Sequence, residues 1–317
     1  CTSTATTVLV VNNATATASN DSPICSGGTA TSVNLTATGT GTYSWAGPAG
    51  YSSSVQNPVV NIPANTAAGN YTYTVTVTNS GCTSTATTVL VVNNATATAA
   101  NNGPICSGAG NATLTATGGG TYQWSGGLGT GATASTSTAG TYTVTVTNNG
   151  CTSTATTVVT VNAPPTASIA GGNICEGNSL TLTASGGSSY NWSGNGVTNP
   201  STNPQVINGL TPSTSTYNVT VTGGNGCTST ASTNITVNAN PTASISGSST
   251  FCVGGNSVLT ASGGGTYQWA ASNGGVITGS SSGSSITVNT AGTYAVTVTN
   301  NGCSSSNSIA VTQATSL

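Results

Sequence analysis

The 317-residue sequence contains no Lys, Arg, His or Met, and its only acidic residues are Asp21 and Glu176. Without imidazole, ammonium or guanidinium groups it offers no His base or His metal ligand and no cationic surface for nucleic acid. The two carboxylates lie far apart in the sequence, which excludes a paired-carboxylate mechanism and leaves calcium without the clustered ligands it needs. The many hydroxyls have no His or Lys base to activate them. We therefore predict a protein that is not an enzyme and that binds no cofactor, metal ion or nucleic acid.

Long apolar runs are also missing. No stretch approaches the length needed to cross a bilayer, and no signal peptide is present. We expect no membrane span in this region, and we interpret it as a piece of a longer secreted polypeptide that is displayed at the cell surface.

An internal repeat is the strongest positive feature. Residues 1–18 recur letter for letter at 82–99, and looser copies of this segment begin at Cys151, Cys227 and Cys303. A period of roughly 70–80 residues indicates a tandem array of one small domain. The predicted array comprises the last strand of a preceding repeat and four full repeats, with boundaries at 1–12, 13–93, 94–162, 163–239 and 240–317.

Within each copy the sequence alternates in the manner of β-strands. In the third copy, 179–185 (SLTLTAS) alternates apolar and polar residues, 217–222 (YNVTVT) follows a Pro/Asn-rich stretch, and 227–238 comes after a Gly-Asn-Gly turn. No segment shows helical periodicity, and short strands separated by Gly, Asn and Pro are typical of a β-sandwich. The predicted fold class is all-β, with tandem immunoglobulin-like β-sandwich domains in a rod-like array.

The aromatic residues occupy fixed places in each copy. Every Trp follows a Tyr by two residues, which is the pattern of a core Trp packed between two sheets rather than of a ligand-stacking residue. A second Tyr precedes each VTVT-like strand. Its setting at 138–142 is similar to an immunoglobulin tyrosine corner, in which the phenol ties down a backbone carbonyl. The predicted core residues are Trp45, Trp124, Trp192, Trp269, Tyr73, Tyr142, Tyr217 and Tyr294.

Several short phrases carry a family resemblance. They are PICSG at 104–108, LTATG at 114–118, YQW at 122–124, AGTYTV at 139–144 and NGC at 149–151. Together they resemble the immunoglobulin-like repeats of giant Bacteroidota surface proteins, which include flavobacterial gliding and attachment adhesins exported by the type IX system. The resemblance extends over nearly the whole chain, and it implies an extracellular, filament-like adhesin.

The nine cysteines are regularly spaced, with one before the second strand and one at the start of the last strand of each full copy. In a charge-poor, secreted-looking chain without CxxC pairs or His, this pattern indicates disulfides rather than zinc. One possible pairing stays within each copy and leaves Cys1 for a missing neighbour. Its bonds are Cys25–Cys82, Cys106–Cys151, Cys175–Cys227 and Cys252–Cys303.

Strand direction favours a second pairing. With seven antiparallel strands, the first turn and the last hairpin lie at opposite poles of the sandwich. A strand of about eight residues spans roughly 26 Å, whereas a disulfide needs Cα atoms within about 7 Å. The hairpin cysteine of one copy then faces the first-turn cysteine of the preceding copy and stiffens the joint without calcium. These inter-domain bonds are Cys25–Cys151, Cys106–Cys227 and Cys175–Cys303, and the partners of Cys1, Cys82 and Cys252 lie elsewhere.

The sequence thus favours a structural and adhesive role, namely a stiff, disulfide-stapled stalk or filament for attachment or gliding. Its expected partners are other copies of itself or a surface polysaccharide. One alternative is a self-assembling extracellular fibre with inter-chain packing or strand donation. The other is a carbohydrate-binding module array beside a missing catalytic domain, which predicts exposed aromatics on one face, whereas the aromatics mostly fit core positions.

Overall fold

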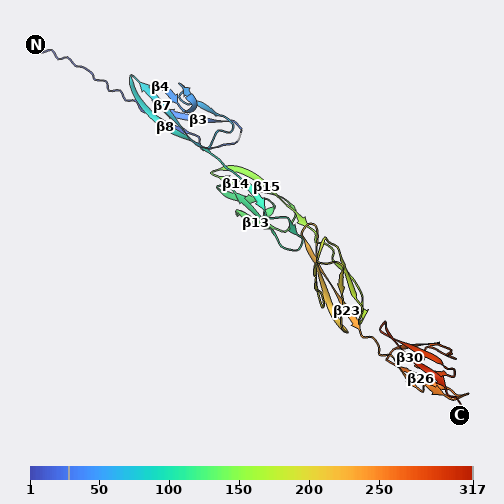
Figure 1. The fold of residues 1–317 in the computed structure, drawn as a ribbon. Coiled ribbons are helices and arrows are strands. Elements are labelled where there is room, and N and C mark those ends of the chain that lie inside the picture. The colour runs from blue at the N-terminus through green and yellow to red at the C-terminus, as the bar shows by residue number, and fades with distance from the viewer. Residues whose placement is uncertain (28, 316–317) are drawn as a thin grey trace. The chain divides into compact units, whose positions relative to one another are not determined.

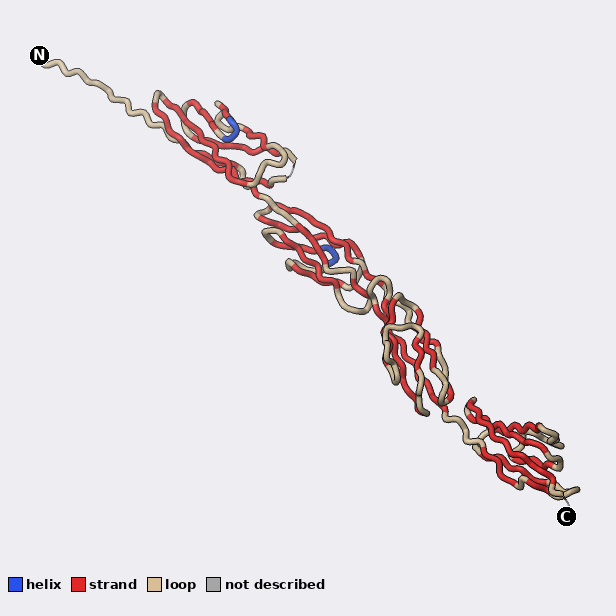
Figure 2. The backbone as a smooth tube through the Cα atoms, viewed as in Figure 1, coloured by secondary structure: helices blue, strands red, loops and turns tan. Residues whose placement is uncertain are grey.

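The computed structural model describes residues 1–27 and 29–315, and almost all of its regular structure is β-strand (Figures 1 and 2). The chain divides into two compact units, Cys1–Asn162 and Ala163–Leu317. Each unit contains two immunoglobulin-like β-sandwiches. We number these repeats 1 to 4, following the boundaries 13–93, 94–162, 163–239 and 240–317.

Repeat 1 is a two-sheet sandwich. Its first sheet has the strand order β1 (Thr17–Asn20), β3 (Thr31–Thr38) and β6 (Val59–Ile62). Its second sheet has the order β2 (Ile24–Cys25), β8 (Cys82–Asn93), β7 (Gly69–Asn79), β4 (Thr42–Ala46) and β5 (Ser52–Ser53). A short 3-10 turn, η1 (Pro48–Gly50), joins β4 and β5.

Repeat 2 follows the same plan with shorter elements. One sheet contains β9 (Thr98–Asn101), β11 (Ala112–Thr117) and β13 (Thr133–Thr136). The facing sheet contains β12 (Thr121–Trp124), β14 (Gly140–Asn148) and β15 (Cys151–Val159). The short strands β10 (Ile105–Cys106) and β16 (Val161–Asn162) pair in parallel, and the 3-10 turn η2 spans Ser125–Gly127.

The second unit repeats this arrangement twice. The first sheet of repeat 3 has the order β17 (Ser168–Ala170), β19 (Leu180–Ser185) and β21 (Gln205–Ile207). Its second sheet has the order β18 (Ile174–Cys175), β23 (Thr228–Asn238), β22 (Ser213–Thr222) and β20 (Ser189–Ser193). The first sheet of repeat 4 has the order β24 (Ser244–Gly247), β26 (Ser257–Ser262) and β28 (Ser285–Val288). Its second sheet has the order β25 (Thr250–Phe251), β30 (Cys303–Gln313), β29 (Gly292–Asn300) and β27 (Thr266–Ser272).

The segment expected as the first turn of each repeat is partly a strand. In repeat 3, Ile174 and Cys175 leave the first sheet and pair in parallel with Val237 and Asn238 at the end of β23. In repeat 1, Ile24 and Cys25 pair in the same way with Val92 and Asn93. Ile174 and Cys175 form a strand rather than a turn because the end of the last strand supplies backbone partners there. The crossing places the cysteine beside the residue that leads into the next repeat.

Each repeat buries one Trp between its two sheets. All four indoles are at most 2% exposed. The indole N–H groups of Trp45, Trp124 and Trp269 donate to the carbonyls of Gln56, Gly131 and Gly283 at 3.0–3.1 Å. The Trp192 N–H is buried without a partner among the described residues. The alternating pattern of apolar side chains thus forms a separate core in each repeat.

The second tyrosine set differs from repeat to repeat. Tyr142 and Tyr294 donate to the carbonyl four residues earlier, at 3.0 and 2.8 Å, as in a tyrosine corner. Tyr217 is buried but donates instead to the carbonyl of Asn195, at 3.1 Å. In repeat 1 the corner bond belongs to Tyr71, which donates to the Ala67 carbonyl at 2.8 Å, while Tyr73 is buried and takes no part in it.

Residues 1–12 have no strand partner among the described residues, so their place as the last strand of a preceding repeat stays a prediction. Leu9 and Val11 are 85% and 81% exposed, and no strand is assigned to this segment. The identical residues of β8, Leu90 and Val92, are buried in the core of repeat 1, where β8 pairs with β7 from Cys82 to Val92.

Candidate functional site at the repeat joints

A disulfide joins repeat 1 to repeat 2. Cys25 lies opposite Asn93, the last residue of β8, and its sulfur bonds that of Cys151, which opens β15 in the next repeat. The Cα atoms are 5.5 Å apart although the residues are 126 positions apart in the sequence. The parallel crossing of β2 carries Cys25 to the pole from which the chain leaves repeat 1. The tight hairpin between β14 and β15 brings Cys151 to the same place.

Two asparagine bonds accompany this disulfide. The side-chain amide of Asn93 donates to the Asn149 carbonyl at 3.3 Å, and that of Asn148 donates to the Asn94 carbonyl at 3.2 Å. Asn149 and Gly150 have positive φ angles of 48° and 81°, the conformation that a two-residue Asn-Gly hairpin requires. The residues around the linker therefore bind the hairpin of the following repeat from both sides.

The joint between repeats 3 and 4 has the same construction. Cys175 bonds Cys303 with a Cα separation of 5.6 Å. The amide of Asn238 donates to the Asn301 carbonyl at 3.1 Å. On the other side of the linker, Asn240 donates to the Glu176 carbonyl at 3.0 Å. The same bond and the same asparagine contact thus recur at two joints with different local sequences.

These bonds decide between the two pairings at four of the nine cysteines. Because Cys25 and Cys175 bond cysteines of the following repeat, they are unavailable for the within-copy partners Cys82 and Cys227. Likewise, Cys151 and Cys303 are unavailable for Cys106 and Cys252, which rules out all four within-copy pairs. Cys106 and Cys227 are not free thiols, and their bond to each other stays a prediction. Three cysteines are free, namely Cys1, Cys82 and Cys252.

The free Cys82 occupies a hairpin position like that of Cys151 and Cys303. Its sulfur lies 3.4 Å from the Asn12 carbonyl, as the Cys303 sulfur lies 3.9 Å from the Asn238 carbonyl. Cys82 thus has the surroundings of a joint cysteine, without the partner sulfur.

The two carboxylates, of Asp21 and Glu176, lie on the surface. Both oxygens of Asp21 accept hydrogen bonds from Asn34, from its backbone and side-chain nitrogens at 2.8 and 2.9 Å. Within residues 1–27 and 29–315, no three His, Cys, Asp or Glu side chains gather where they would hold a metal ion. In the same part of the chain, neither 3-10 turn nor any other helix is long and apolar enough to cross a membrane.

Sequence reasoning missed the joint asparagines. Asn93 and Asn238 end their strands, and Asn149 and Asn301 begin the next hairpins. The available signal was the recurrence of Asn at the end of the last strand together with the Asn-Gly pair. Neither residue type alone distinguishes a joint contact from an ordinary turn.

Comparisons with known proteins place this geometry in the immunoglobulin-like class. Residues 162–241, which contain repeat 3, match the family described as Ig-like domain CHU_C associated. No curated protein matches the sequence. Similar solved structures include the first eight Ig domains of Down Syndrome Cell Adhesion Molecule, at 15% identity and a TM-score of 0.33 over 94% of this chain and 54% of that one.

Two further structures have similar coverage. Sidekick-1 immunoglobulin domains 1–4 match at 14% identity with a TM-score of 0.28, over 92% of this chain and 96% of that one. The insect immune protein hemolin also matches at 14% identity and 0.28, over 90% and 96%. The chain spans about half of the length of the first of these structures. The strand order and the family match together show a tandem array of immunoglobulin-like repeats, in which disulfides link repeat 1 to repeat 2 and repeat 3 to repeat 4.

Proposed function

We propose that this chain is the structural and adhesive repeat region of a secreted bacterial cell-surface protein, and that it forms a stiff stalk for attachment or gliding. The observation that carries the proposal is the Cys25–Cys151 bond, which connects the exit pole of one repeat to the entry hairpin of the next. The equivalent Cys175–Cys303 bond shows that the connection is a feature of the repeat.

The joint restrains its two domains at more than one point. The peptide linker between β8 and β9 is only residues 94–97. A single short linker still permits rotation about its bonds. The disulfide and the Asn93 and Asn148 contacts add attachments on the hairpin of repeat 2, so rotation requires breaking at least one of them. With only two acidic residues, the chain lacks the clustered carboxylates that a calcium-stiffened joint needs. A disulfide stiffens the joint covalently instead.

The composition supports a role outside the cell. Disulfides persist in oxidising compartments. The absence of Lys and Arg leaves no cleavage site for trypsin-like proteases. An adhesive surface made of Thr, Ser and Asn approaches a neutral target without electrostatic repulsion, and weak contacts from many repeats add through effective concentration.

Electron microscopy of the full 317-residue chain tests the stalk. We compare the distribution of angles between adjacent repeats in the oxidised protein and in the double variant C25S/C151S. We expect a narrow distribution at this joint in the oxidised protein and a visibly broader one in the variant. The single variant Cys252→Ser, which removes an exposed free thiol, is the matched control. Equal angle distributions in all three proteins would contradict the stiffening role.

A self-assembling fibre, in which one chain donates a strand to a sandwich of another chain, is the second candidate. Residues 1–12 have the same letters as β8, so they are the segment that such an exchange would use. Sedimentation velocity with and without the substitutions Leu9→Thr and Val11→Thr tests it. Assembly that these changes abolish supports a fibre, whereas a single monomeric species in both proteins excludes it.

A further inference from the structure

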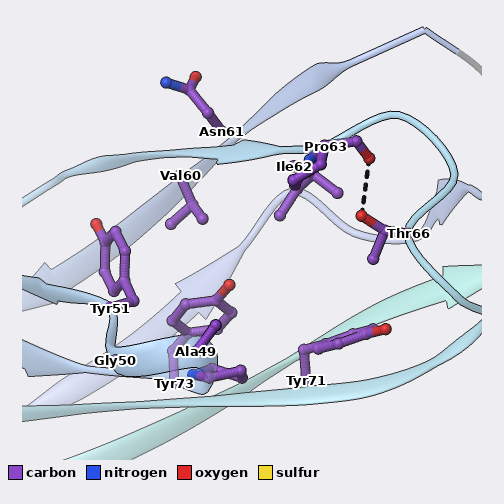
Figure 3. Close-up of a pocket in the computed structure, with 11 residues that line it drawn as sticks. Ala49, Gly50, Tyr51, Val60, Asn61, Ile62, Pro63, Thr66, Tyr71 and Tyr73 are labelled. Atoms are coloured by element: carbon purple, nitrogen blue, oxygen red, sulfur yellow. Dashed lines mark hydrogen bonds between the residues drawn. The ribbon is translucent and has the colours of Figure 1, made fainter.

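Repeat 1 contains a pocket of about 420 Å³. It lies between the turn η1, strand β6, the loop that follows β6, and strand β7 (Figure 3). Its walls consist mainly of rings and aliphatic side chains: Pro48, Tyr51, Val60, Ile62, Pro63, Tyr71 and Tyr73. The volume is within the range of small-molecule sites.

The hydroxyl of Tyr73 is the unusual group of this pocket. The Tyr73 residue is only 4% exposed, yet its hydroxyl makes no hydrogen bond to any residue within 1–27 or 29–315. The hydroxyl oxygen is not sealed from water, because among the described residues the fully buried polar side-chain atom without a partner is the Trp192 indole nitrogen. In the same strand position of the other repeats, the hydroxyls of Tyr142, Tyr217 and Tyr294 all donate to backbone carbonyls.

A neighbouring residue explains why Tyr73 is unpaired. In repeat 1 the corner bond to a carbonyl four residues earlier is made by Tyr71, which occupies the place that Gly140 has in repeat 2. Tyr71 therefore does two things: it takes over the structural bond, and its ring forms a wall of the pocket. The Tyr73 hydroxyl therefore makes no corner bond, and it faces the pocket (Figure 3).

The walls are held in place before any ligand arrives. The rings of Tyr51 and Tyr73 meet edge to face, with centroids 5.4 Å apart and an interplanar angle of 83°. Gly47 lies against the Tyr73 ring, where a Cβ atom would come within 2.4 Å of the ring carbon Cδ1. The Thr66 hydroxyl fixes the rim by donating to the Pro63 carbonyl at 2.7 Å. A pocket fixed in this way loses little entropy on binding.

We propose that this pocket binds a neutral sugar ring of a surface glycan. No charged side chain lines it, so an ionic ligand would lose hydration without compensation. Tyr and Pro rings offer flat apolar surfaces to the C–H face of a pyranose. The Tyr73 hydroxyl, as both donor and acceptor, pairs with a sugar hydroxyl or an acetamido carbonyl. The inference deepens the adhesive part of the proposed function and rests on it for its biological meaning.

Ligand-observed NMR on the full chain tests this proposal. The probes are the neutral methyl glycosides of glucose, galactose, mannose, fucose and N-acetylglucosamine, together with a proline-rich peptide as the competing apolar ligand. We expect at least one glycoside to bind and the peptide not to bind. No glycoside with a Kd below about 10 mM, or binding of the peptide alone, would overturn the proposal.

Matched variants locate the binding. Tyr73→Phe removes only a hydroxyl that has no partner in the protein, so it leaves the fold of repeat 1 intact and weakens sugar binding roughly tenfold. Tyr142→Phe, the same change in repeat 2, removes a hydroxyl bonded to Thr138 and leaves sugar binding unchanged. Sugar affinity equal in wild type and Tyr73→Phe would refute the site. The joint angles are measured separately, so loss of the sugar site and loss of the stalk are distinguishable.

Discussion

Removing the Cys175–Cys303 bond is the most informative perturbation, because its effect follows from the register of the strands. When repeat 4 unfolds and repeat 3 stays folded, Cys175 remains fixed beside Asn238. The bond then closes a loop from Asn238 to Cys303, a separation of 65 residues. The chain-entropy relation gives about 4 kcal/mol for such a loop. For a domain of this size, that corresponds to a fall of roughly 15–30 °C in the midpoint of thermal unfolding.

The assay is calorimetry of the full chain and of the double variant C175S/C303S, with hydrogen exchange to assign each transition to a repeat. We expect the transitions of repeats 3 and 4 to move down and that of repeat 1 to stay within about 2 °C. Replacing both cysteines leaves no new thiol to exchange. The control is again Cys252→Ser, whose thiol is exposed and unbonded.

One result would refute the reasoning. If repeat 4 unfolded at the same temperature in the wild type and in C175S/C303S, the bond would add nothing to the domain it enters. A fall in the unfolding temperature of repeat 1 alone would also refute the reasoning, since repeat 1 shares no bond with these cysteines.

Three further predictions concern single groups. Before reduction, a thiol assay on the denatured chain should find three reactive thiols, those of Cys1, Cys82 and Cys252, and a larger number would contradict the joint bonds. Burial, followed by the charges of Tyr51 and Tyr71, raises the pKa of Tyr73 above 10, so its contribution to stability is present below pH 10 and lost above it. Urea unfolding from pH 9 to 11 should show a decline in repeat 1 that Tyr73→Phe reduces. Finally, Trp192→Phe should destabilise repeat 3 by about 1 kcal/mol less than Trp124→Phe destabilises repeat 2, as native-state exchange measures, because only the Trp124 indole N–H has a partner to lose.

The core could be predicted closely from the sequence. The alternation in 179–185 appears as β19, with Leu180, Leu182 and Ala184 buried, and each Trp lies between two sheets. These features follow from strand geometry, in which successive side chains point to opposite faces, and they need no knowledge of distant residues. The strand β21 was missed because only three residues, Gln205–Ile207, pair with β19, too few for a periodic signal.

The tyrosines show where the local sequence pattern is not enough to predict the hydrogen bonds of a side chain. Tyr73 and Tyr142 follow the same motif and occupy the same register, opposite Thr88 and Thr157. Their hydroxyls nevertheless have different surroundings, because Tyr71 replaces a glycine two residues earlier and takes the corner bond. A change at one position redirected the hydrogen bond of another, and the aromatic pocket resulted from it.

The sequence by itself determined the class of this protein: repeated, nearly uncharged and all-β. Composition and periodicity are properties of the sequence alone, so they can be interpreted without knowing which residues meet in space. Only the tertiary structure decided which cysteines meet, because Cys25 reaches Cys151 through the parallel crossing of β2 and the hairpin of another repeat.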